Sequence, residues 1–440
     1  MDEDMRSGEA AAARLARGAS LDEVLDASDP AAWTALDAGV RRWAWYRIEA
    51  LPDKAWVEGL DGVTGSAGLI GTVRGVFRSP AWRPEPAPCI ESGLAMALCH
   101  PDGRTREAAL HRVADRPALL PLVVVRAADW AAAVRDRARE LLRASLDVRT
   151  GVALAPLILR VGRRDRGAFG VELLGGMLRR APHGAIASLL VHPDRGVRRF
   201  AYRLAVEESL LPPDRLARTA SWDDDVVVQS LCAEAALAAV RESGDVDGVL
   251  EPLLAARNPR VRSAGVTALR WAGRPGRARE FLADRSALVR ACARYVVRQH
   301  GKDPLPWYRQ RCAEPTDPAL PPGAVIGLAE CGERGDAGLL RPLLGHPMSA
   351  VRARAVAGLH TLDVTHAEEL RPLLDDPAPA VVREATAALL PCAALLPEAW
   401  LRERLAAERP RHVRTAAHRL AEARGWGAEQ RRTASVQQRE

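Results

Sequence analysis

Three copies of one pattern near the C-terminal end decide the fold: HPMSAVRARAVAGL at residues 346–359, DDPAPAVVREATAALL at residues 375–390 and ERPRHVRTAAHRL at residues 408–420. In each copy a turn that carries proline leads to a Val-Arg step, and then to Ala and Leu at helical spacing. The arginines are Arg352, Arg383 and Arg414, and each lies 31 residues after the one before. A fixed period of this size is typical of repeat proteins.

The middle copy shows why the pattern forms a helix that needs neighbours. Asp376 can accept backbone N–H bonds at a helix start, and Pro377 suits the first helical position. One face then carries apolar and small residues at i, i+3, i+4 and i+7, namely Val382, Ala385, Thr386 and Leu389. A two-helix unit of about 30 residues cannot bury such a face alone, so we expect successive units to stack and share one core.

The Val-Arg step recurs upstream at spacings between 27 and 35 residues. Copies with the arginine occur at Val289-Arg290, Val261-Arg262, Val197-Arg198 and Val134-Arg135, and more loosely at Thr105-Arg106. Copies without it lie near Val228 and Val325. Together these units predict an all-α fold of about 10–12 two-helix repeats.

The Asp-Pro turn, the Val-Arg step and the alanine-rich second helix resemble HEAT repeats, in the short bacterial form named after phycobilisome lyases. The resemblance covers residues 91–425 and implies a right-handed α-α superhelix. It also implies that arginines at the repeated position form a structural ladder with turn acids such as Asp376. Those arginines are Arg106, Arg135, Arg198, Arg262, Arg290, Arg352, Arg383 and Arg414.

Composition changes along the chain predict three regions. Residues 1–90 form an N-terminal helical capping region that ends in a glycine-rich and then a proline-rich connector. Within it, Asp29-Pro30 is expected to open a helix with Trp33, Leu36 and Val40 on its core face. Residues 91–425 form the repeat solenoid, and residues 426–440 form a polar tail that we expect to be disordered.

Aromatic and basic side chains alternate between Arg41 and Arg47. One interpretation is that Trp45 or Tyr46 stacks on nucleic-acid bases beside arginines that bind phosphates. The other is that this segment caps the open end of the solenoid. Both interpretations stay open at this point.

The seven cysteines are scattered and include no CxxC pair, which indicates reduced thiols in a cytoplasmic protein. The N-terminus is acidic and lacks an apolar signal core, and no run is long and apolar enough to span a membrane. Cys99 and His100 match no zinc-ligand spacing. No phosphate loop, dinucleotide fingerprint, catalytic triad or paired-carboxylate motif is present. We therefore expect no cofactor, no metal and no enzyme activity.

The net charge of +7 is unevenly distributed. Residues 1–60 carry a net charge of −5, residues 160–204 carry +7, and residues 401–440 carry +5. Arginines outside the repeated position are the candidates for polyanion binding, with a solvated surface as the alternative. These candidates are Arg163, Arg164, Arg166, Arg179, Arg180, Arg195 and Arg199.

Repeat architecture does not fix function, because HEAT-like folds include scaffolds, chromophore lyases, regulatory subunits and nucleic-acid enzymes. The leading hypothesis is a non-catalytic scaffold that grips a protein partner on its concave face. The second is a nucleic-acid-binding protein, similar to the alkylpurine DNA glycosylases. Asp129-Trp130 and Trp222-Asp223 have the residue types of their sites but align with no motif. The third is a lyase or accessory factor of the phycobilisome type. The sequence leaves the partner and the oligomeric state open.

Overall fold

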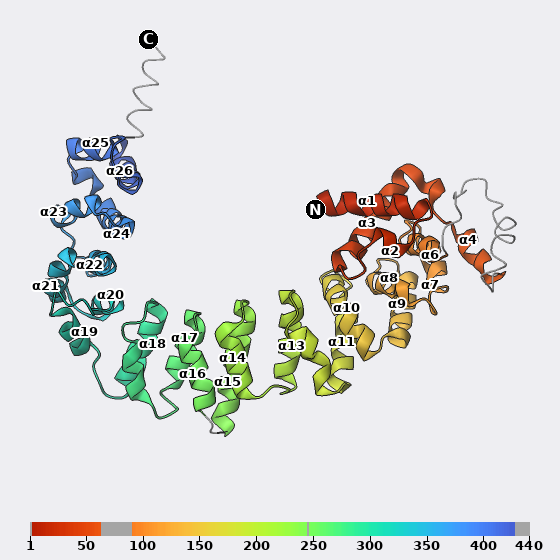
Figure 1. Cartoon of the computed structure of the whole chain (residues 1–440), viewed down its shortest axis with the longest axis horizontal. Helices are drawn as coiled ribbons and strands as arrows, with labels where there is room; N and C mark the ends of the chain where they lie inside the picture. The colour runs from red at the N-terminus through yellow and green to blue at the C-terminus, as the bar shows by residue number, and fades with distance from the viewer. Residues whose placement is uncertain (1, 63–89, 244–245, 427–440) are drawn as a thin grey trace, which may run out of the picture. The chain divides into compact units, whose positions relative to one another are not determined.

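The computed structural model describes residues 2–62, 90–243 and 246–426, so most of the glycine-rich and proline-rich connector and nearly all of the C-terminal tail lie outside the described residues. The described chain consists of α-helices and short 3₁₀ helices joined by turns, and it contains no β-strand (Figure 1). The all-α class is therefore confirmed. The chain divides into two compact units, residues 1–211 and residues 212–440.

The first unit begins with a helical hairpin and continues with four helix pairs, α6/α7, α8/α9, α10/α11 and α12/α13. Its elements are α1 (Asp2–Ala16), α2 (Leu21–Val24), α3 (Pro30–Arg47), η1 (Ile48–Ala50), α4 (Lys54–Glu58), η2 (Gly59–Gly62), α6 (Ile90–Leu98), α7 (Gly103–Leu110), η3 (Pro117–Leu119), α8 (Leu120–Arg126), α9 (Ala132–Ser145), α10 (Val148–Val161), α11 (Ala168–Arg180), η4 (His183–Ile186), α12 (Ala187–Leu190) and α13 (Arg195–Glu207).

The second unit contains seven pairs, in which several first helices are short or of the 3₁₀ type. Its elements are α14 (Pro213–Trp222), α15 (Val226–Ser243), α16 (Asp247–Ala255), α17 (Pro259–Ala268), η5 (Pro275–Phe281), α18 (Ala287–Gln299), α19 (Leu305–Cys312), α20 (Pro322–Cys331), η6 (Arg334–Asp336), α21 (Ala337–Leu340), η7 (Arg341–Gly345), α22 (Ser349–Thr361), α23 (Ala367–Leu370), η8 (Arg371–Asp375), α24 (Pro379–Leu389), η9 (Leu390–Leu395), α25 (Glu398–Leu405) and α26 (Arg411–Arg424).

The helices of each repeat stack in two rows. In Figure 1 the second helices α20, α22, α24 and α26 follow one another on one side, and α19, α21, α23 and α25 follow on the other. One cluster of buried apolar side chains extends from Leu250 to Leu362, and another from Val356 to Leu420. Both clusters include residues of α22, so the core passes from repeat to repeat, as a solenoid requires.

The apolar stripe of α24 is buried as its spacing predicts, from Val382 through Thr386 to Leu389. The start of this helix, however, differs from the prediction. Asp376 closes a turn by accepting a hydrogen bond from the Ala378 N–H at 2.8 Å, and the helix begins at Pro379 rather than at Pro377. Two prolines in the turn allowed both registers, and only Pro379 occupies a first helical position.

The N-terminal hairpin packs against the first helices of the first unit. Asp29 accepts a hydrogen bond from the Ala31 N–H at 2.8 Å and Pro30 begins α3, as predicted. Helices α1 and α3 cross at two glycines, where a Cβ added to Gly39 would lie 2.1 Å from the carbonyl carbon of Gly8. Backbone contact this close requires glycine. Helix α1 also contacts α6, and α3 contacts α8 and α10.

Candidate functional site

The turn before six of the second helices repeats one hydrogen-bonded arrangement, complete in five of them. We call the fourth residue of a second helix the ladder position, and the residue six places before it the turn residue. At Arg352 the Nη1 atom donates to the carbonyl oxygens of His346 and Pro347, at 2.8 and 3.1 Å. Arg106, Arg135, Arg198 and Arg262 make the same pair of bonds to their own turns, and Arg290 makes the first of the two.

Three of these arginines also join one repeat to the next turn. In three cases the Nε and Nη2 atoms donate side by side to the carboxylate of the following turn residue, at distances between 2.7 and 3.0 Å. These pairs are Arg106 with Asp129, Arg262 with Asp284, and Arg352 with Asp376. Each aspartate also accepts a backbone N–H two residues ahead. A planar guanidinium matches a carboxylate in this bidentate geometry, so each aspartate caps its own turn and ties it to the preceding repeat.

In five repeats the type of turn residue matches the preceding ladder position. Turn aspartates Asp129, Asp284 and Asp376 follow repeats that carry a ladder arginine. By contrast His192 and His346 follow repeats with Val171 and Val325 at that position. Each histidine still caps its turn, because its Nδ1 accepts the N–H two residues ahead at 3.0 Å. In these two repeats histidine therefore stands at a turn that receives no ladder arginine.

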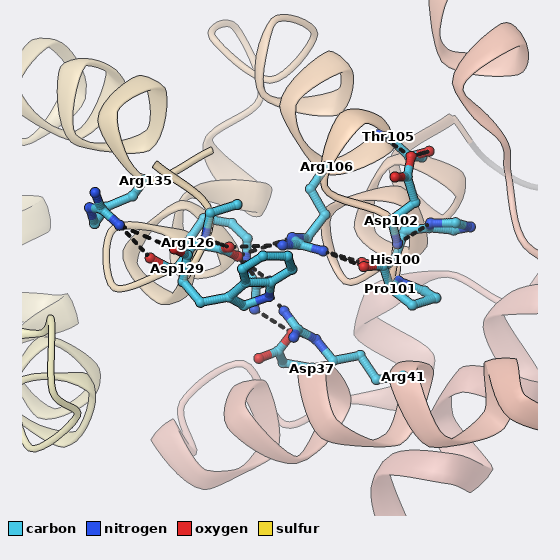
Figure 2. A network of polar contacts seen from close by, with 12 residues as sticks. Asp37, Arg41, His100, Pro101, Asp102, Thr105, Arg106, Arg126, Asp129 and Arg135 are labelled. Atoms are coloured by element: carbon cyan, nitrogen blue, oxygen red, sulfur yellow. Dashed lines mark hydrogen bonds and ion pairs between the residues drawn. The ribbon is translucent and has the colours of Figure 1, made fainter. Parts of the chain in front are cut away.

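A buried ionic network extends the ladder into the N-terminal hairpin (Figure 2). Asp129 accepts from Arg126 Nη1 at 2.9 Å in addition to Arg106, and Arg126 also pairs with Asp37 of α3. Arg41 of α3 lies 3.2 Å from Asp37 and 3.7 Å from Asp129. The side chains of Arg106 and Asp129 are completely buried. The hairpin is thus tied to the first repeats by charge as well as by apolar packing.

The surroundings of Asp129 oppose a catalytic role for it. Burial by itself raises the pKa of this carboxyl, but the hydrogen bond from Arg106 and the charges of Arg126 and Arg106 outweigh burial and lower the pKa below its ordinary value. A carboxylate whose oxygens already bind two guanidinium groups and a backbone N–H has little capacity to accept a proton. The neighbouring Trp130 is 62% exposed, and the Arg106 guanidinium lies 5.4 Å from its ring centroid.

Of the arginines that the sequence placed in the ladder, Arg383 lies outside it, whereas Arg414 occupies the ladder position of α26. At the ladder position of α24 the residue is Val382, which is 1% exposed, whereas Arg383 points outward and pairs with Glu384 at 3.2 Å. The reason is the extra residue between the turn acid and the Val-Arg step, which shifts the register by one. Arg414 has the predicted position in α26, but its buried Nε has no partner among the described residues.

In two other repeats the ladder residue makes a contact that is not an arginine–aspartate ion pair. We call the contact of a ladder residue with a neighbouring repeat a rung. The turn residue after Arg290 is Ala319, and the Arg290 guanidinium pairs instead with Glu330 of α20, which also accepts from Arg294 at 2.7 Å. In α15 the ladder residue is Gln229, which donates to the Asp223 carbonyl oxygen and accepts from Asn258 Nδ2 at 2.6 Å. This rung carries no charge.

The arginines proposed for polyanion binding lie in the first unit but do not form a uniform basic surface. Arg164 lies 3.7 Å from Asp37, and Arg179 pairs with Glu207 at 3.0 Å and with Glu208 at 2.9 Å. The Arg163 guanidinium reaches the start of α13, 3.1 Å from where a Cβ on Gly196 would lie. Arg166, Arg180 and Arg195 are exposed, and Arg199 is partly buried.

The aromatic side chains at the end of α3 are solvent-exposed. Trp45 is 87% exposed and Tyr46 is 77% exposed, whereas Trp33, Leu36 and Val40 form the buried face of the helix. The exposure of Trp45 and Tyr46 does not support the capping interpretation for these two residues, and base stacking by them stays a prediction.

Two grooves open between second helices of the second unit. The first, of about 440 Å³, lies between α15 and α17. Its lining residues are Glu234, Leu237, Ala238, Arg241, Ser263, Ala264, Thr267, Ala268 and Trp271. Trp271 is partly buried, and the Arg241 guanidinium lies 5.4 Å from its ring centroid. No buried carboxylate faces this groove.

The second groove, of about 510 Å³, lies between α24 and α26. Its lining residues are Pro379, Val382, Arg383, Thr386, Arg411, His412, Thr415, Ala416 and Arg419. Three arginines and one histidine therefore surround it, and no aspartate or glutamate is among the lining residues.

The described chain also contains histidines and buried thiols, residue types that can act as metal ligands or reactive groups. No group of three metal-binding side chains occurs within residues 2–62, 90–243 and 246–426. His100 uses its Nδ1 to accept the Asp102 N–H at 2.9 Å, as the other turn histidines do. Burial raises the pKa of Cys99, Cys232 and Cys312 to about 12, so these thiols are unreactive. Among the described helices, none combines the length and apolar composition of a bilayer span.

The paired helices, the proline turns and the arginine ladder define a protein of stacked HEAT-like helical repeats. No protein-family model and no curated protein matches the sequence. Three solved structures show the range of likeness. An engineered protein matches 75% of this chain and 97% of its own, with 17% identity and a TM-score of 0.20. Kap121p matches 96% and 54%, with 12% identity and a TM-score of 0.32, so the chain spans about half of that protein. Importin beta matches 96% and 66%, with 14% identity and a TM-score of 0.26.

Proposed function

We propose that the protein is a non-catalytic scaffold that binds a protein partner on the face formed by its second helices. The observation that carries this proposal is the groove between α15 and α17. It is open, it is built from two adjacent second helices, and its walls combine Trp271 and Leu237 with Arg241. Tryptophan and arginine are the residue types that dominate the energy of protein interfaces.

The groove has the chemistry of recognition rather than catalysis. Glu234 is its only acidic lining residue, and it is exposed on α15. A catalytic carboxylate is usually desolvated inside its cleft, whereas the side chain of Glu234 is exposed to solvent. The Arg241 guanidinium lies over the Trp271 ring, and this cation–π contact restrains both side chains within the groove.

Nucleic-acid binding is the less favoured function. The sequence feature that best supports it is the basic segment 160–204. Within that segment Arg164 lies near Asp37, and Arg179 pairs with Glu207 and Glu208, so two of the candidate arginines are neutralised. The aspartate with glycosylase-like surroundings, Asp129, is held by Arg106 and Arg126 inside the fold.

A site-specific crosslinking experiment tests the proposal. A photoreactive amino acid replaces Ala238, which is exposed in the groove, and in a matched protein it replaces Ala255, which is exposed on the first helix α16. After irradiation in the native cell, we expect discrete polypeptide adducts from position 238 and none from position 255. The additional substitution Trp271→Ala should remove the adduct at position 238.

Two outcomes would contradict the scaffold function. Equal adducts from both positions would show that the groove is not a preferred surface. Adducts that disappear after nuclease treatment would show that the partner is a nucleic acid. In that case, retention on duplex DNA should fall steeply with salt, because several counterions are released on binding.

A further inference from the structure

The groove between α24 and α26 has a composition of its own, which suits a narrower class of ligand. We propose that it binds an acidic, carboxylate-rich segment of the partner protein, an inference that rests on the scaffold function. Arg383, Arg411 and Arg419 line the groove without a single carboxylate among the lining residues. The groove therefore presents three positive charges in one concavity.

These arginines are available to a ligand. Among the described residues, Arg383 forms an ion pair with Glu384 of its own helix alone, at 3.2 Å, and its side chain is 66% exposed. An exposed ion pair of this kind contributes little and exchanges readily. For Arg411 and Arg419, no ion pair is found within the part of the chain that the structure describes.

The ladder is interrupted at this repeat. In the preceding repeat the ladder arginine, Arg352, extends to the next turn at Asp376. In α24 the ladder residue is Val382, which is too short to reach α26. The space between the two helices is left with a floor of small side chains, Val382, Thr386 and Ala416, below the arginines.

The size and electrostatics of the groove agree with a short extended peptide. Its volume of about 510 Å³ lies within the range of roughly 300–1,000 Å³ that is usual for ligand clefts. Pro379 and Arg411, the first residues of α24 and α26, both belong to the lining. The positive ends of two helix dipoles therefore add to the arginine charges. Guanidinium groups bind carboxylates in a bidentate way.

The lining favours a peptide over a nucleic acid. Single-stranded nucleic acids are held by aromatic side chains on which bases stack as well as by cations. No aromatic side chain other than the His412 imidazole lines this groove, and His412 already lies 3.3 Å from the Asp376 carbonyl oxygen. The apolar floor instead suits the methylene groups of glutamate side chains.

Fluorescence anisotropy with the full chain tests the proposal. The probe is a fluorescein-labelled peptide of alternating glutamate and glycine, and the matched probe carries glutamine in place of glutamate. The groove variant is R383Q/R411Q/R419Q. The control variant R260Q/R298Q/R354Q removes three exposed arginines from other second helices of the same unit, so both variants lose equal charge.

We expect the groove variant to bind the glutamate peptide about tenfold more weakly than the wild type, because three exposed charge contacts together amount to one such factor. The control variant should bind within about twofold of the wild type, and the glutamine peptide should not bind either protein measurably. The single variant R419Q should weaken binding about twofold, and it keeps the assay decisive if the triple variant does not fold.

Several results would overturn the proposal. Equal weakening by both triple variants would show general attraction to a basic protein. Unchanged binding by the groove variant would place the peptide elsewhere. Stronger competition by an oligonucleotide or a phosphorylated peptide of equal charge would assign the groove to phosphate. None of these results bears on the α15–α17 groove, whose crosslinking test is separate.

Discussion

Replacing Asp129 by asparagine removes the central carboxylate of the buried network. This carboxylate lies between Arg106 Nη2 at 2.8 Å, Arg106 Nε at 3.0 Å and Arg126 Nη1 at 2.9 Å. Arg126 retains Asp37 as a partner, but Arg106 has no second carboxylate within the described residues. Its side chain is fully buried, so the substitution leaves an uncompensated charge inside the first unit.

The expected destabilisation follows from that geometry. Removing one partner of a buried ion pair costs about 3–5 kcal/mol, because the remaining charge stays desolvated. Asparagine keeps the volume of aspartate and can still accept the Ala131 N–H, so the loss reports on the charge and not on the turn. A domain is stable by only about 5–15 kcal/mol, so the first unit of D129N should be close to unfolding.

Hydrogen exchange measured by mass spectrometry at increasing urea gives the opening free energy of each segment. We expect the peptides of α3, α7, α8 and α9 to lose protection in D129N, while those of the second unit change little. The control is Glu140→Gln, which breaks an exposed pair with Arg137 in the same unit and should cost less than about 1 kcal/mol. A change in D129N no larger than in the control would refute the account of the network.

Four further predictions concern other features. Arg352→Ala should lower the free energy of unfolding of the second unit by about 3 kcal/mol, whereas Arg383→Ala should change it by less than about 0.5 kcal/mol; urea titration compares them. Gly39→Ala should destabilise the first unit by about 1–3 kcal/mol, since its methyl group would meet the backbone of α1, and a lower melting temperature would show it. Burial alone raises the pKa of Asp376, but hydrogen bonds from Arg352 and a backbone N–H outweigh it, so the folded pKa lies below the unfolded value of about 3.9. The stability difference between wild type and D376N should therefore be constant above about pH 5 and disappear as the pH falls through the folded pKa, as urea midpoints over a pH series would record. The Cys312 thiol, whose pKa burial raises to about 12, should react with dithionitrobenzoate only after unfolding.

The sequence predicts the repeats because their signal is local. Proline turns, a Val-Arg step and helical spacing recur at a steady interval, and helices follow at nearly every copy. The residues at the ladder position are harder to predict from the sequence. The step at Val382 and Arg383 contains one additional residue after its turn acid, and only the register in space shows that Val382 is the ladder residue.

Some of the arginine–aspartate pairs of the ladder can nevertheless be predicted from their spacing in the sequence. A turn aspartate follows its ladder arginine by 22 to 24 residues, as in Arg262 with Asp284 and Arg352 with Asp376. This nearly constant spacing identifies which aspartate pairs with which ladder arginine. The partnership of Asp37 with Arg126 has no such signal, because it joins segments 89 residues apart through the packing of α3 on α8. The grooves also depend on packing, since each needs two second helices side by side.

The hydrogen bond between Gln229 and Asn258 carries no charge, so acid should affect the contacts between repeats of the second unit unequally. Acid protonates the carboxylates of Asp284 and Asp376 and so removes their attraction to arginine. Protonation at the same pH leaves a hydrogen bond between two amides unchanged. We therefore expect the contact between α15 and α17 to persist at low pH while the charged contacts of the following repeats weaken. The tryptophan-lined groove spans this contact, so its two walls keep their spacing under conditions that weaken the contacts further along the chain.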